Sequence, residues 1–333
     1  MPAPPRRTQG PPAQTAAAGD PPPPATVSIV IPTYRRHATL KRLLPGYARQ
    51  PGVLEIVLVD DGSPEPLTLD DLPPAPGSAP IRIVRHARTL GLPAARNTGI
   101  DAVTGSLVLF GEDDVVLSEG HVEALLRERQ RLGAALIAGR LVQQLADEDA
   151  PTALAQAERS GRPLFNRRLL TVDTSVLTEA RELPCAHAIF MAPRDLLARE
   201  RFSTRLGGPT FLREDQEMQL RLRRLGHRLW VTPAAWSLHL AKNTTAGGGT
   251  RTYASLAAQL ASAGVNTWEV LRAYEAELTP FFGSMSPGEV RAAIAAYGAL
   301  EAKNWLRSES PLLDRWARRL ADPHRWTSRA GRD

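Results

Sequence analysis

The chain has 333 residues, of which 43% are hydrophobic and 23% charged, a composition typical of a folded protein with a sizeable core. Its net charge of +6 favours acidic partners, but aromatic residues make up only 5% and do not alternate with basic ones, which argues against nucleic acid as a partner. A single cysteine excludes an internal disulfide framework, and no stretch approaches the roughly 18 apolar residues of a membrane span, so we expect a cytoplasmic protein.

Residues 1–25 are rich in Pro and Ala, which is typical of a disordered tail. Beyond them, short apolar runs alternate with helical periodicity, the pattern of an α/β fold whose mostly parallel sheet is flanked by helices. The first predicted strands are 26–31, 55–59, 81–84 and 107–110, with a helix over 38–49. Further strands are predicted at 134–138, 186–191 and 228–232, with an excursion of short elements over 144–180.

Strand 107–110 ends in three consecutive carboxylates, Glu112, Asp113 and Asp114. Neighbouring acids repel one another, and the hard oxygen ligands that Mg²⁺ and Mn²⁺ prefer would explain why they stand together. A solvated acidic turn is the alternative. Because the other early strands also end in polar loops, and ligands gather at the carboxyl edge of such sheets, we expect these loops to form one crevice.

A helix predicted over 210–227 carries Asp215 on the same face as Met218 and Leu222, whereas Glu217 points away from that face. A carboxylate on an apolar face is costly unless it pairs with an arginine or has a chemical role. The residues alone leave both interpretations open.

The part of the chain beyond about residue 250 is predicted to form a helical appendage, with helices over 252–263, 267–278, 287–307 and 312–320. Its tryptophans lie in arginine-rich surroundings, as in helices that bind a membrane surface. Packing on the preceding domain or on a partner subunit is the alternative. The sequence leaves the oligomeric state open.

Motifs along the chain resemble those of the family 2 glycosyltransferases. They are VSIVIPTYRR over 27–36, VDDGS over 59–63, ARNTGI over 95–100, the acidic triplet, and Arg213-Glu214-Asp215. The resemblance covers roughly residues 26–245. It divides the chain into a tail (1–25), a glycosyltransferase domain (26–245) and a helical C-terminal region (246–333).

The resemblance implies the glycosyltransferase A fold, a nucleotide-diphosphate sugar donor with UDP favoured, a divalent metal, and inversion during transfer to an unidentified acceptor hydroxyl. Asp215 matches the catalytic base, and Asp114 matches the metal ligand, with Glu112 and His239 as further candidate ligands. The implied substrate-binding residues are Pro32, Thr33, Tyr34, Arg35, Asp61, Arg96, Asp113 and Glu214. Among these, Asp61 would bind the base, Arg96 the diphosphate or ribose, and Asp113 the ribose or sugar.

The chain departs from the family pattern at two places. Glu112 stands where the family commonly has Asp, which leaves open a catalytically inactive nucleotide-sugar-binding protein that acts through its C-terminal helices. The segment 183–187 lacks the expected Gly-Asn pattern, so Cys185 and His187 either influence acceptor binding or serve ordinary packing.

Overall fold

A computed structural model of the chain describes residues 25–72, 79–144, 149–206, 212–240 and 256–309. The predicted disordered tail therefore falls almost entirely outside the described residues, as does the helix predicted over 312–320.

The N-terminal half of the central sheet is parallel, as predicted. Strand β1 (Val27–Thr33) pairs with β2 (Val53–Asp60) on one side and with β4 (Leu107–Phe110) on the other, and β3 (Ile81–Arg85) pairs with β2 at the edge. All seven residues of β1 are buried, which is why its sequence is mostly apolar rather than an alternation of apolar and charged residues.

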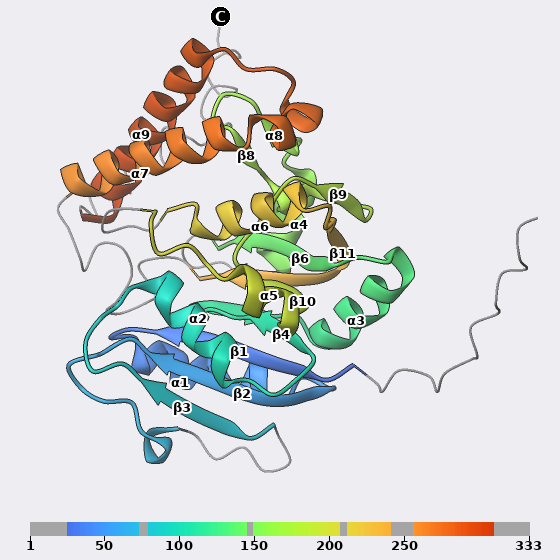
Figure 1. Ribbon diagram of the computed structural model, residues 1–333, viewed down its shortest axis with the longest axis vertical. Helices are drawn as coiled ribbons and strands as arrows, with labels where there is room; N and C mark the ends of the chain where they lie inside the picture. Colours follow the sequence, from blue (N-terminus) through green and yellow to red (C-terminus); the bar gives the residue numbers. More distant parts are fainter. Residues whose placement is uncertain (1–24, 73–78, 145–148, 207–211, 241–255, 310–333) are drawn as a thin grey trace, which may run out of the picture.

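Two helices cover opposite faces of this half-sheet (Figure 1). Helix α1 (His37–Ala48) packs on Ile29 and Ile31, and α2 (Leu92–Ala102) packs on Val30. Because successive side chains of a strand point to opposite faces, the two helices bury alternate residues of β1.

The second half of the sheet is mixed. Strand β10 (Phe190–Pro193) runs antiparallel to both β4 and β6 (Leu136–Gln143), and β11 (Leu229–His239) runs parallel to β6. Two short strands, β5 (Val115–Leu117) and β9 (Arg181–Leu183), are antiparallel to β11. The order β3-β2-β1-β4-β10-β6-β11-β5 places β4 and β10 at the centre.

The remaining elements flank this sheet. The predicted excursion contains a helix, a short antiparallel hairpin and a 3₁₀-helix, so its short elements are confirmed. Within the excursion these are α4 (Ala150–Arg159), the hairpin of β7 (Phe165–Asn166) and β8 (Thr171–Val172), and the 3₁₀-helix η2 (Thr174–Val176). The other helices are α3 (His121–Leu132), α5 (Arg194–Glu200), α6 (Glu214–Arg224) and the 3₁₀-helix η1 (Leu69–Asp71).

The C-terminal helices are α7 (Leu256–Ala273), α8 (Glu275–Phe282) and α9 (Pro287–Glu309). The prediction of separate helices over 252–263 and 267–278 is wrong, because α7 runs unbroken through Gly264. A Cβ at that position would lie 3.5 Å from Ile294 of α9, so packing between helices outweighs the local tendency of glycine to end a helix.

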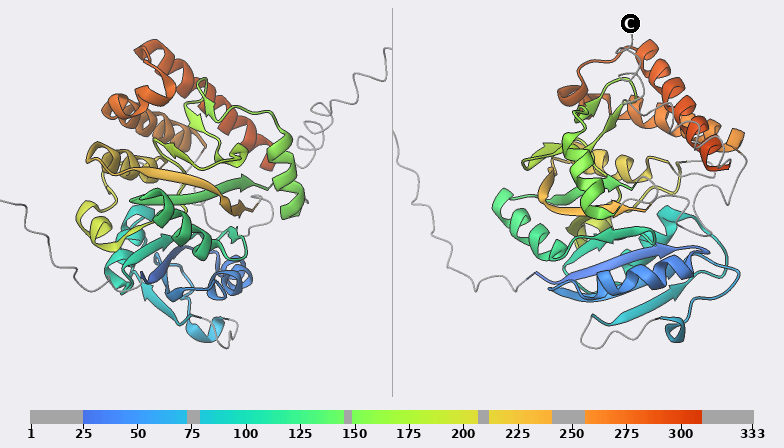
Figure 2. Two further views of the ribbon diagram at one scale, coloured as in Figure 1. Left: turned by 90° about the vertical axis from the view of Figure 1, so that its right-hand side faces the viewer. Right: turned by 180° about the vertical axis from the view of Figure 1, so that it is seen from behind.

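Figures 1 and 2 show these helices as a layer at the end of the molecule opposite β3. They pack against α6 and the loop before β10 through one apolar cluster. Its buried members are Leu170, Cys185, Leu206, Leu220, Val270, Leu271, Tyr274, Leu278, Phe282, Met285, Val290 and Ala293. Among the described helices, none is long and apolar enough to cross a membrane.

Candidate active site

The acidic triplet forms the loop between β4 and β5, and Tyr47 of α1 holds it in place. The Tyr47 hydroxyl donates to the carbonyl of Glu112 at 3.0 Å and accepts from its amide at 3.2 Å. Gly111 makes this approach possible, since a Cβ there would lie only 2.7 Å from the tyrosine ring. The backbone of the loop is therefore fixed by the protein itself.

The three carboxylates point to different partners. Asp113 faces the end of β1, where it accepts from the Thr33 hydroxyl at 2.8 Å and from Arg36 at 3.0 Å. Burial raises the pKa of Asp113 to about 6, although the Arg36 guanidinium opposes this rise. Arg36 also donates to Asp114, so one guanidinium bridges two of the three acids. The sequence motif contains Arg36, but we did not expect it to contact the triplet.

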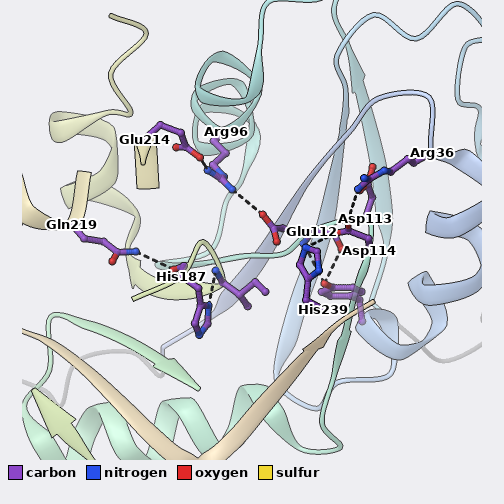
Figure 3. A network of polar contacts seen from close by, with 11 residues as sticks. Arg36, Arg96, Glu112, Asp113, Asp114, His187, Glu214, Gln219 and His239 are labelled. Atoms are coloured by element: carbon purple, nitrogen blue, oxygen red, sulfur yellow. Dashed lines mark hydrogen bonds and ion pairs between the residues drawn. The ribbon is translucent and has the colours of Figure 1, made fainter. Parts of the chain in front are cut away.

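Asp114 faces the end of β11. Its Oδ1 lies 3.6 Å from Nε2 of His239, and its carbonyl accepts from the amide of Leu240 at 2.9 Å. Ligand atoms of Glu112, Asp114 and His239 all lie within 4.8 Å of one another. Two carboxylates and an imidazole at such spacing fit a divalent cation such as Mn²⁺ or Mg²⁺. Figure 3 shows the three side chains converging.

Arg96 links the triplet to helix α6. Its guanidinium is fully buried and donates to Glu112 at 3.3 Å and to Glu214 (Figure 3). It also lies over the ring of Phe202. Burial raises the pKa of Glu214 to about 8, although Arg96 opposes this rise. Arg96 thus lies between two carboxylates of the protein in the described structure. Its contact with a donor diphosphate stays a prediction.

Asp215 lies in the first turn of α6, next to Glu214, and is partly buried. Burial raises its pKa, and the charge of Arg96 opposes the rise, so Asp215 is close enough to interact electrostatically with the cluster. The prediction that Glu217 points away from the buried face is wrong. Glu217 is buried and accepts from the hydroxyl of Tyr274, because the C-terminal helices cover a second face of α6.

The predicted nucleoside-binding residues gather at the carboxyl ends of β1 and β2. Pro32 and Thr33 pair with the last residues of β2, and Arg35 follows in a left-handed conformation with φ 56°. Its amide donates to the hydroxyl of Ser63 at 2.9 Å, and its guanidinium lies 5.9 Å from the ring of Tyr34. The loops after the two strands are thus bound to each other.

Asp61 is already engaged by protein donors. One of its oxygens contacts Nδ1 of His86 at 2.7 Å and the amide of Leu90 at 2.9 Å, and the other accepts from the amide of Gly91 at 2.9 Å. These contacts tie the β2 end to the loop that precedes α2. Its interaction with a nucleobase stays a prediction.

The loop before β10 is held by α6. Gln219 accepts from the amide of Ala186 at 2.6 Å and donates to the carbonyl of His187 at 3.1 Å. The His187 imidazole donates to the carbonyl of Gly139 at 2.9 Å, and burial lowers its pKa to about 4. Burial raises the pKa of the Cys185 thiol to about 12. These contacts favour a packing role for both residues.

Comparison with known proteins finds similarity to glycosyltransferases. Residues 28–181 match the model of Glycosyl transferase family 2. The pre-mycofactocin glycosyltransferase of Mycobacterium tuberculosis is 30% identical over 216 residues, which are 64% of this chain and 42% of that protein. The uncharacterized glycosyltransferase YwdF of Bacillus subtilis is 32% identical over 103 residues, 31% of this chain and 37% of that one. The chain thus spans less than half the length of these curated relatives.

Among solved structures, the crystal structure of S. aureus TarS 1-349 in complex with UDP-GlcNAc has the same fold. It matches with a TM-score of 0.50 and 15% identity, covering 82% of this chain and 71% of TarS 1-349. The motifs at the strand ends, the match over 28–181 and the homologous glycosyltransferases confirm the predicted family. Residues 28–181 of the chain thus form a domain of the glycosyl transferase family 2 type.

Proposed function

We propose that the chain is an inverting, divalent-metal-dependent glycosyltransferase that moves a sugar from a nucleotide-diphosphate sugar to an acceptor hydroxyl. The observation that carries the proposal is the arrangement around Arg96. A cluster competent to bind a metal, Glu112 with Asp114 and His239, lies on one side of its guanidinium, and Glu214 with Asp215 lies on the other.

Glu112, Asp114 and His239 are the residues that would hold the cation. When bound, it would supply positive charge to the diphosphate leaving group. Arg36 compensates Asp113 and Asp114 in the described structure, and its position beside them suits an anionic donor.

Asp215 is the base in this proposal. Inversion by a single displacement requires one group that takes the proton of the attacking hydroxyl. A carboxylate with a raised pKa accepts that proton more readily than an ordinary one, and burial raises the pKa of Asp215. Glu214 would help to hold this helix end in place through its ion pair with Arg96.

A UDP-linked sugar is the favoured donor. TarS, which has the same fold, has been crystallised with UDP-GlcNAc, so UDP-sugars are the first donors to test. The nucleoside would bind in the loops after β1 and β2, with Pro32, Thr33, Tyr34 and Arg35 along one side and Asp61 on the other. Those loops are already bound to each other, which lowers the entropic cost of donor binding.

The catalytically inactive alternative rested on Glu112 in place of the usual aspartate. Its carboxylate lies within 4.8 Å of the ligand atoms of Asp114 and His239, so the longer side chain reaches the cluster. No observation on the described residues favours a pure binding protein.

The acceptor is a hydroxyl compound of unknown identity. Peripheral contact with an anionic membrane through the C-terminal region would suit a lipid-linked acceptor. Co-sedimentation of the whole chain with vesicles containing phosphatidylserine, at low and high salt, tests this contact. Binding that salt does not weaken, or no binding at low salt, would argue against it.

The central experiment is a panel of UDP-, GDP- and dTDP-linked sugars incubated with the protein, with and without Mn²⁺. We expect release of nucleoside diphosphate from one donor, dependent on the metal, and faster once an acceptor is supplied. Tight donor binding without any release, across the panel and with diverse sugar acceptors, would instead indicate a binding protein.

A further inference from the structure

The C-terminal helices contact α6 along its whole length. At its start, Thr267 of α7 accepts a hydrogen bond from Nε of Arg213 at 2.9 Å. At the end of its first turn, the Tyr274 hydroxyl donates to Glu217 at 2.6 Å. At its end, Arg224 pairs with Glu277 of α8 at 2.7 Å.

The contact at the start of α6 falls on a residue in an unfavourable conformation. Arg213 precedes the helix with φ 71° and ψ 14°, in the left-handed region that L-residues other than Asn and Asp rarely adopt. Within the described part of the chain, only two other non-glycine residues have a φ in the left-handed range, Arg35 with φ 56° and Leu170 with φ 51°. Arg213 directly precedes Glu214 and Asp215, so its backbone sets how the chain enters the helix.

Arg213 is also buried, with 5% of its surface exposed. Within the described residues it forms no ion pair with a carboxylate, and its guanidinium donates to Thr267 and to the side chain of Gln216 at 2.6 Å. The preceding carbonyl, of Leu212, accepts from Asn266 of α7 at 3.3 Å. Adjacent residues of α7 therefore hold both the side chain of Arg213 and the backbone just before it.

We propose that the C-terminal helices position the catalytic base, with Thr267 and Tyr274 as the positioning residues. Thr267 holds Arg213 in its left-handed conformation, and Tyr274 fixes the end of the first turn through Glu217. Together they keep the first turn of α6, and with it Asp215, in place beside Arg96. This inference rests on the proposed role of Asp215.

Loss of the Thr267 contact should affect the two sides of the site differently. Without the Thr267 hydroxyl, Arg213 is released toward the extended conformation usual before a helix, and Asp215 shifts with it. The loops that would bind the donor are held by Tyr47 of α1 and by Ser63 in the loop after β2, and stay in place. Loss of the contact should therefore lower kcat and leave donor binding unchanged.

The test compares Thr267→Val with Thr267→Ser in the full chain, and Thr279→Val serves as the matched control. Thr279 lies in the same helical region, but its hydroxyl donates only within α8, to the carbonyl of Glu275 at 2.7 Å. Thr267→Val should lower kcat by about 10- to 100-fold, as expected for a small misplacement of a reacting group, with donor KM and the Kd for UDP with Mn²⁺ unchanged. Thr267→Ser should restore kcat, and Thr279→Val should not change it.

Hydrogen exchange supplies a second measurement that does not depend on activity. The amide of Glu217 donates to the carbonyl of Arg213 at 2.8 Å, so its exchange reports whether the first turn of α6 is held. Thr267→Val and Tyr274→Phe should each speed exchange there, whereas Thr279→Val should not.

The two measurements separate the possible failures. Unchanged exchange in Thr267→Val and Tyr274→Phe would overturn the positioning role, whatever the activity. If the wild-type protein transfers no sugar but the variants still show faster exchange, the contact between α7 and α6 is supported and the catalytic role of α6 is overturned. A parallel loss of kcat and of UDP affinity would show a general structural defect and would also overturn the inference.

Discussion

The imidazole of His239 lies 3.6 Å from the carboxylate of Asp114, although the two residues are far apart in the sequence and His239 lies beyond the last of the glycosyltransferase motifs. Strand pairing produces this proximity. His239 is paired with Val115 in β5, and the amide of Leu240 donates to the carbonyl of Asp114. The last strand of the sheet thus brings a nitrogen ligand to a loop that otherwise offers only oxygen.

Substitution of the cluster should weaken metal binding. We expect Asp114→Asn and His239→Ala each to lower Mn²⁺ affinity by more than about 100-fold, since even the outer partners of metal ligands are worth about 10- to 100-fold. Glu112→Gln should have an effect of the same kind, whereas Glu119→Gln, at an exposed position in the next turn, should have none. Titration calorimetry with Mn²⁺ measures each affinity. Equal affinity in the wild type and Glu112→Gln would remove Glu112 from the ligand set.

Replacement of the base should strongly reduce the rate of transfer without weakening donor binding. We expect Asp215→Asn to lower kcat by about 10²- to 10⁴-fold, the usual contribution of a general base, and to keep the Kd for UDP. Asp195→Asn, an exposed aspartate of α5, is the matched control. Normal turnover by Asp215→Asn would exclude Asp215 from the mechanism.

The pH dependence of transfer should follow the same carboxylate. A base works in its deprotonated form, and burial raises the pKa of Asp215, so kcat should fall with decreasing pH at values above the ordinary aspartate range near about 4. The pH profile of kcat at saturating donor and metal measures this. A profile that stays flat down to pH of about 4 would contradict the raised pKa.

Loss of the buried Arg96 should destabilise the fold. Arg96→Met leaves Glu112 and Glu214 without their shared cation, and breaking a buried pair in this way costs about 3–5 kcal/mol. Arg201→Met removes an exposed pair with Asp101 and should cost no more than about 1 kcal/mol. Urea unfolding of the two variants and the wild type measures the loss of unfolding free energy in each. Equal losses of unfolding free energy would show that burial of Arg96 adds nothing to its pairing.

Stability should also fall in mild acid because of His121. The imidazole is fully buried, its Nδ1 donates to the carbonyl of Trp236 at 3.0 Å, and within the described residues its Nε2 has no hydrogen-bond partner. Burial lowers its pKa from 6.5 to about 4, so the unfolded chain binds the extra proton first.

The contribution of His121 is thus fully present above pH 6.5 and is lost as pH falls toward 4, up to about 3 kcal/mol. The free energy of unfolding in urea, measured between these pH values, tests the loss. His121→Gln should flatten the dependence. An unchanged slope in that variant would assign the effect to other groups, of which His187 is the first candidate because its pKa is lowered in the same direction.

The N-terminal half of the fold was predictable because its signals are local. Each strand there is a short apolar run that ends in a polar loop. Because the carboxyl ends of parallel strands lie at the same edge of a sheet, these loops are expected to lie close together. The prediction for 228–232 stopped too early because Pro233 cannot donate to a neighbouring strand. The pairing of β11 with β6 absorbs it as an irregularity between Val231 and Trp236, and the strand continues to His239.

The candidate site likewise contains residues that local motifs predict and contacts that they do not. Motifs name its carboxylates, but no local pattern predicts that Tyr47 holds the Glu112 backbone or that Thr267 holds Arg213. Those contacts join residues far apart in the sequence, so only the fold determines them. The same applies to β5, whose three residues become a strand only because β11 lies beside them.

The position of β10 has a consequence for biosynthesis. This strand lies between β4 and β6, yet it follows both in the chain, so neither can complete its pairing until residues 190–193 leave the ribosome. Until then β4 and β6 each present an open edge able to pair with another chain. Aggregation of the nascent protein should therefore be most frequent in chains that stall between β6 and β10. Release past Pro193 should cover the edge of β4 and one edge of β6, whose other edge is covered only when β11 follows.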